Sequence, residues 1–214
     1  MLITAMEPRR KRLTALFLDG EFAVKLDTET LLQSGWRVGM EMDDEALHQL
    51  IQRSDTHRAQ EKALYLLEHR SHSKKELTEK ISRTAGRDAA EHAAQRMEEL
   101  GLIDDVQYAR RFAEELLQRK CFAARRAEYE LLQKGIDREL VRTIVDELAP
   151  EPEESLRLLI ERKYRSALSD EKGRRRVFAA LQRLGYRTED IRSVLRNYID
   201  YENEDGMNGI GWND

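Results

Sequence analysis

Apolar residues follow two different patterns along the chain. Near the start, the apolar run Leu16–Leu18 precedes Asp19-Gly20, and the run Phe22–Val24 follows it. An Asp-Gly pair between two apolar runs is typical of a β-hairpin, because both turn positions need a positive φ. Residues 3–6 are compatible with a third strand. From about residue 55 onward the apolar positions recur at helical spacing, which predicts a mainly α chain behind a small N-terminal β-hairpin segment.

Helix boundary signals recur along this second part. Ser73 and Glu76 form an S-x-x-E capping box, in which the serine hydroxyl accepts a hydrogen bond from a free backbone N–H. Gly101, Gly135 and Gly185 each follow an apolar stretch, and we expect each to end a helix. Short helices joined by short loops are typical of small helical bundles.

An internal repeat organises the helical part. Sliding the chain by fifty residues aligns 131–145 with 181–195, and it places Gly135 on Gly185 and Val141 on Ile191. Each repeat is about 45–50 residues long and holds three helices. Tandem three-helix repeats bury their faces against one another, which predicts an elongated curved array with a concave side. The expected division is a β-hairpin/helix segment (1–54), three three-helix repeats (55–104, 105–149 and 150–199) and an acidic disordered tail (200–214).

Composition excludes several protein classes. The 214 residues are 36% charged with a mean hydropathy of -0.72, and no apolar run approaches the roughly 20 residues of a membrane-spanning helix. Cys121 is the only cysteine, which excludes an internal disulfide and a thiolate zinc site. The first residues lack the apolar core of a signal peptide, so we expect a cytoplasmic protein.

Catalytic motifs are absent from the sequence. It contains neither G-x-x-x-x-G-K-[ST] nor G-x-G-x-x-G, and its five histidines form no H-E-x-x-H. His69 and His72 are expected to be solvated at a helix end. Asp104-Asp105 is interpreted as a helix cap with a dipole-favoured acid, and Cys121 lacks a histidine partner. We therefore expect no enzymatic activity, no catalytic residues, no metal and no cofactor.

Charge is distributed unevenly along the chain. The net charge is -4, yet the last fifteen residues hold five acids and no base, whereas 153–196 holds twelve bases and seven acids, or about +5. Basic residues gather at the start of the second helix in two successive repeats, and such clusters bind carboxylates or phosphates. The candidate partner-binding residues are Arg119, Lys120, Arg125, Arg126 and Lys134 in a first basic cluster, and Lys172, Arg175 and Arg176 in a second.

A solvated helix face is the alternative interpretation of these clusters. Arg126 lies four residues before Glu130, which is the spacing of a helical ion pair. The second cluster has no following acid before Glu189, so pairing explains it less well. Within it, Arg174 borders the apolar stripe of its helix, so its stem is expected to pack, whereas Arg175 and Arg176 are expected to be exposed.

Three motifs resemble the RecX family, the regulators of the RecA recombinase. Residues 101–109, Gly-Leu-Ile-Asp-Asp followed by Tyr-Ala, resemble the family signature G-[LYF]-[IL]-[DN]-D-x-x-[YF]-A. Residues 131–136 are similar to its E-L-x-x-K-G-I motif, and residues 73–77 to its S-x-x-E-L motif. The resemblance extends over about residues 58–199. One departure is that the family usually has a K-G-x-G-like stretch between the first two helices of the central repeat. This chain reads Arg119-Lys120-Cys121-Phe122-Ala123-Ala124-Arg125-Arg126 there, without the glycines that adopt a positive φ freely.

The resemblance implies a function and a partner. Members of the family lie in the groove of the RecA–DNA filament and inhibit its ATPase, strand-exchange and coprotease activities. It therefore implies a monomeric, non-enzymatic regulator whose partner is the RecA filament, with single- or double-stranded DNA as a further partner and no membrane. A non-specific DNA-binding helical protein that competes with RecA for DNA is the alternative.

Overall fold

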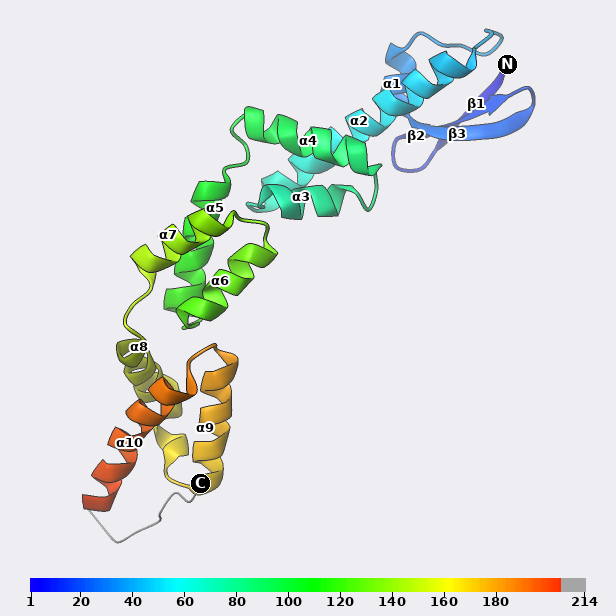
Figure 1. Ribbon diagram of the computed structural model, residues 1–214. Coiled ribbons are helices and arrows are strands. Elements are labelled where there is room, and N and C mark those ends of the chain that lie inside the picture. The colour runs from blue at the N-terminus through cyan, green and yellow to red at the C-terminus, as the bar shows by residue number, and fades with distance from the viewer. Residues whose placement is uncertain (205–214) are drawn as a thin grey trace. The chain divides into compact units, whose positions relative to one another are not determined.

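The structure, a computed structural model, describes the backbone of residues 1–204 and the side chains of residues 1–198 (Figure 1). It divides into two compact units, which we call unit 1 (Met1–Asp105) and unit 2 (Val106–Asp214). The expected tail lies outside the described residues from Asp205 onward, as does Trp212. None of the helices among residues 1–204 combines the length and apolarity needed to cross a bilayer.

Unit 1 joins a small sheet to helices. Its three strands form one antiparallel sheet in the order β1-β2-β3. The elements are β1 (Ile3–Arg9), β2 (Leu13–Leu18), β3 (Glu21–Asp27), α1 (Thr28–Gln33), α2 (Asp44–His69), α3 (Lys74–Ile81) and α4 (Arg87–Glu99).

Unit 2 is entirely helical in its described part. The elements are α5 (Asp105–Glu114), the π-helix η1 (Glu115–Arg119), α6 (Ala124–Gln133), α7 (Arg138–Leu148), α8 (Pro152–Leu159), the π-helix η2 (Ile160–Tyr164), the 3₁₀-helix η3 (Arg165–Leu168), α9 (Glu171–Arg183) and α10 (Thr188–Glu204). The first helix of each three-helix repeat in this unit thus ends in a π-helical turn. The mainly α fold class with a small N-terminal sheet is confirmed.

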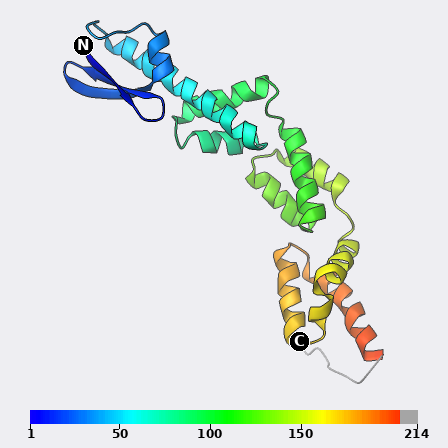
Figure 2. The ribbon, with the colours of Figure 1, turned by 180° about the vertical axis from the view of Figure 1, so that it is seen from behind.

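The N-terminal hairpin follows from its turn. Asp19 and Gly20 have φ values of 50° and 88°, as the Asp-Gly pair predicts, and β1 adds the third strand. The sheet packs on α1 and the first half of α2 (Figure 2). Its buried face combines alternate strand residues with residues of the helices and of the loop before α2: Ile3, Leu16, Leu18, Leu26, Leu31, Met42 and Leu50.

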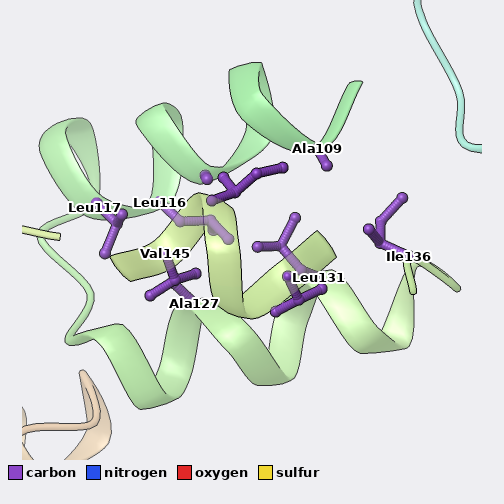
Figure 3. Close-up of a cluster of buried hydrophobic side chains, with 10 residues drawn as sticks. Ala109, Leu116, Leu117, Ala127, Leu131, Ile136 and Val145 are labelled. Atoms are coloured by element: carbon purple, nitrogen blue, oxygen red, sulfur yellow. The ribbon is translucent and has the colours of Figure 1, made fainter. Parts of the chain in front are cut away.

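The fifty-residue spacing organises the three helical cores. Positions 77, 127 and 177 are buried, as are positions 81, 131 and 181, one turn further along the same helix of each repeat. In the second repeat, Ala127 and Leu131 of α6 face Leu116 and Val145 from the flanking helices (Figure 3). The aliphatic composition of these cores explains why the protein needs few aromatic residues.

Two helices extend past the limits expected from the sequence. α2 is continuous through Ser54, so the sheet and the first helical repeat share one helix. α10 continues through Tyr201 to Glu204, beyond the residue at which the third repeat was expected to end. A long shared helix explains why unit 1 is one compact unit.

His72 departs from the expectation of a solvated histidine. Its side chain is 3% exposed, whereas His69 is exposed. The ring lies directly before the capping residue Ser73, with Nδ1 3.2 Å from Oε2 of Glu76. Burial lowers the pKa of His72, and the nearby charge of Arg70 lowers it further.

We expect unfolding stability to fall as the pH drops through the ordinary histidine range, because of His72. The unfolded chain takes up a proton below about pH 6.5, whereas the folded chain resists it, so the stability is present above that pH and is lost below it. Urea unfolding between pH 5 and pH 8 checks this. His72→Gln should flatten the profile and His69→Gln should leave it unchanged; equal profiles for all three proteins would contradict the assignment.

Gly173 is required by a close backbone approach. A Cβ added there would lie 1.9 Å from the carbonyl oxygen of Ala167, which belongs to the η3 turn before α9. We expect Gly173→Ala to destabilise the protein by about 1–3 kcal/mol, the range for overpacking. Gly86→Ala is the matched control, since nothing lies within 4 Å of its added Cβ. Similar urea midpoints for the two variants would show that η3 yields without cost.

Candidate partner-binding surface

The first basic cluster extends from the last residue of η1, through the loop before α6, to the C-cap of α6. Arg119, Lys120 and Arg125 are exposed, whereas Arg126 and Lys134 are half-buried. The helix α6 begins at Ala124, so Arg125 and Arg126 occupy its first turn. The structure thus brings these five residues onto neighbouring parts of one repeat.

Phe112 joins the two lysines of this cluster. Nζ of Lys120 and Nζ of Lys134 each lie 5.8 Å from the centre of its ring, within the range of a cation–π contact. Lys120 also pairs with Glu115 at 3.0 Å. Phe112 also packs against the core of the second repeat.

Arg126 makes cation–π contacts with two aromatic rings. Its guanidinium carbon lies 5.7 Å from the ring centre of Phe122 and 5.6 Å from that of Tyr129. The expected pair with Glu130 is confirmed at 2.6 Å. Sequence reasoning missed Phe122 and Tyr129, although Tyr129 at i+3 is on the same helical face as Arg126.

Backbone contacts join this loop to the third repeat. The N–H of Ala123 donates to the carbonyl of Leu184 at 2.9 Å, and the hydroxyl of Tyr186 donates to the carbonyl of Cys121 at 3.2 Å. Burial raises the pKa of Tyr186 to about 12, so this hydroxyl keeps its proton. A Cβ added at Gly185 would lie 2.5 Å from Cβ of Arg126, so the two chain segments are in close contact.

Cys121 has a strained backbone in this loop. Its φ is 54°, in the left-handed region that favours glycine. A non-glycine residue pays roughly 1–2 kcal/mol there. Its side chain packs against the core of the third repeat, which offsets part of this strain.

The second basic cluster lies near the start of α9. Lys172, Arg175 and Arg176 are exposed and Arg174 is half-buried, as the apolar stripe predicts. Arg175 pairs with Glu171, one turn earlier. Glu171 precedes the cluster, whereas only acids that follow it were considered as partners, so this ion pair was not predicted.

The two clusters are separate in space. Arg126 touches Gly185 just beyond the C-terminal end of α9, whereas Arg175 lies ten residues earlier, or about 15 Å along a helix. Each cluster retains exposed cations that form no ion pair with any residue between 1 and 198. These are Arg119 and Arg125 in the first basic cluster, and Lys172 and Arg176 in the second.

Comparison with known proteins decides the family. The profile of the second three-helix domain of RecX matches residues 104–143, and that of the third matches residues 151–195. A regulatory protein RecX from Chlorobium phaeobacteroides is 32% identical over 146 residues, which cover 66% of this chain and 94% of the relative. The chain belongs to the RecX family. The regulatory protein RecX of Caldanaerobacter subterraneus is 27% identical over 199 residues and covers 91% of this chain, so the similarity reaches beyond the helical repeats.

Solved RecX structures share the fold. A crystal structure of regulatory protein RecX aligns with a TM-score of 0.58 at 19% identity, over 90% of this chain and 98% of that chain. The structure of RecX from Lactobacillus salivarius aligns at 0.54 with 18% identity, over 68% of this chain and 97% of that one. The alignments cover at least 97% of each solved chain, so the whole fold of each solved chain has a counterpart in this protein.

The backbone strain at Cys121 can be measured by comparing the stability of two substitutions. We expect Cys121→Gly to be more stable than Cys121→Ala by about 1 kcal/mol, because both variants lack the thiol and only glycine relieves the left-handed backbone. Elsewhere the order is normally reversed, since glycine loses more entropy on folding. Urea unfolding of the two variants measures the difference. An alanine variant as stable as the glycine variant would exclude strain at this position.

Proposed function

We propose that this protein is a non-enzymatic regulator of RecA that binds the RecA–DNA filament and inhibits its ATPase, strand-exchange and coprotease activities. Membership of a family of regulatory proteins supports a regulatory role. The observation that carries the proposal is the pair of basic clusters in unit 2, each with exposed cations left unpaired by residues 1–198.

The chemistry of the clusters fits a partner with regularly spaced acidic groups. Arg119, Arg125 and Arg176 offer planar guanidinium groups, which bind carboxylate or phosphate through two parallel hydrogen bonds. Two anchors about 15 Å apart along a helix engage separate points on a partner, so they favour an extended surface over a small ligand. A RecA filament presents such a surface, with acidic protein groups and DNA phosphates together.

Non-specific DNA binding is the second candidate, favoured by the same unpaired cations. Salt separates the two functions, because phosphate binding releases counterions. Affinity for single-stranded DNA then falls with a log–log slope of about -0.7 per neutralised phosphate. We propose that affinity for preformed RecA filaments falls less steeply than affinity for bare strands when both are titrated at matched salt. Equal slopes and equal affinities would favour the DNA-binding function instead.

We expect Lys172→Ala combined with Arg176→Ala to weaken inhibition of the RecA ATPase by about 100-fold or more, since two charge-assisted hydrogen bonds are lost and each is worth about 1.5–3 kcal/mol. Both residues are exposed, so the stability should change by no more than about 0.5 kcal/mol per site. The measurement is the protein concentration giving half-inhibition on single-stranded DNA.

The matched control is Arg192→Ala combined with Arg196→Ala. These residues are also exposed, also one turn apart on a helix of the third repeat, and their loss changes the charge equally. The control should inhibit nearly as well as the unaltered protein. An equal loss in both double variants would show that total charge, and not the second basic cluster, determines inhibition.

A further inference from the structure

Three side chains of the types that bind metal ions lie together in unit 1. Asp27 ends β3, and His57 and Glu61 lie one turn apart on α2. One ligand atom from each side chain lies within 4.8 Å of the others. We propose that Asp27, His57 and Glu61 bind one zinc ion, which ties the N-terminal sheet to α2.

The carrying observation is the relation between His57 and Asp27. Nδ1 of His57 lies 3.1 Å from Oδ1 of Asp27, shielded from solvent, yet it forms no hydrogen bond with any described residue. Two ligand atoms on a tetrahedral zinc ion with bonds near 2.0–2.1 Å are about 3.3 Å apart. The two side chains therefore already approach each other as closely as two ligands of one such ion do.

Asp27 is rigidly placed for this role. Its side chain is buried, and Oδ1 accepts hydrogen bonds from the N–H and the hydroxyl of Thr30 at 2.8 and 3.0 Å. The N–H of Asp27 donates to the hydroxyl of Ser54 on α2 at 2.8 Å. The two Thr30 bonds hold the carboxylate in place and use the lone pairs of Oδ1, so Oδ2 is the oxygen left to bind the ion.

Glu61 is the adjustable ligand. It is partly exposed and pairs with Arg12 at 2.8 Å, while Arg12 also pairs with Glu29 at 3.1 Å. Exposed ion pairs contribute about 0–1 kcal/mol, so a metal ion can take Glu61 and leave Arg12 with Glu29. Arg12 thus competes with the metal for one ligand.

The ligand set selects the class of ion. One imidazole nitrogen and two carboxylates suit zinc and similar transition metals, with water in the remaining position. Calcium and magnesium take oxygen ligands, so the histidine disfavours them. A single bound ion that joins β3 to α2 stabilises this part of the fold, since it binds only the folded arrangement.

The test titrates zinc chloride into the full chain, freed of metal and of affinity tags, and measures heat. We expect one equivalent to bind, with the visible spectrum of tetrahedral cobalt when cobalt chloride replaces zinc. His57→Gln should lower the affinity at least about tenfold, as loss of a ligand-shell group does. His48→Gln, an exposed histidine earlier on α2, is the matched control and should bind normally.

Arg12→Ala gives a second, independent readout. If Glu61 is a ligand, removing its competitor should raise zinc affinity several-fold, whereas adventitious binding to surface histidines would not respond. Glu61→Gln should weaken binding without disturbing the buried cap at Asp27. No binding, or binding unaffected by His57→Gln and Arg12→Ala, would overturn the proposal.

Discussion

The packing of unit 2 depends on how the backbone N–H groups at the start of α6 find hydrogen-bond partners. Ala123 precedes the helix and has no side chain that could cap it. Its own N–H is satisfied by the carbonyl of Leu184, so the third repeat supplies a partner that the second repeat lacks. Buried backbone groups must be paired, and this pairing holds the two repeats together at one point. The same contact fixes the loop that carries the first basic cluster.

Local signals in the sequence were sufficient to predict the N-terminal hairpin and the helical architecture. The Asp19-Gly20 turn and the cap at Ser73 depend on neighbouring residues, and the fifty-residue spacing of buried positions such as Leu131 and Leu181 reflects the same local helix pattern repeated along the chain. Periodicity and capping report directly on such short-range structure. The same reasoning correctly separated the half-buried Arg174 from the exposed arginine that follows it.

Features that arise from packing between distant segments could not be predicted from these local signals. His72 is buried by tertiary contacts that its place at a helix end does not reveal. Asp27 and His57 are thirty residues apart, and only the sheet packing on α2 brings them together. The aromatic partners of Arg126 also escaped prediction, because the sequence does not show which side chain a loop ring such as Phe122 or an exposed ring such as Tyr129 contacts.

The glycines that end the helices differ in how freely they could be replaced. Gly101 has a φ of 70° and open space around it, so asparagine, which also enters the left-handed region, fits there. Gly185 has a φ of 96° and also lies against the backbone and Cβ of Arg126, where any side chain is excluded. The turn after α9 is therefore constrained by its neighbour in the preceding repeat, so glycines that end helices in similar repeats tolerate substitution unequally because of how the repeats pack.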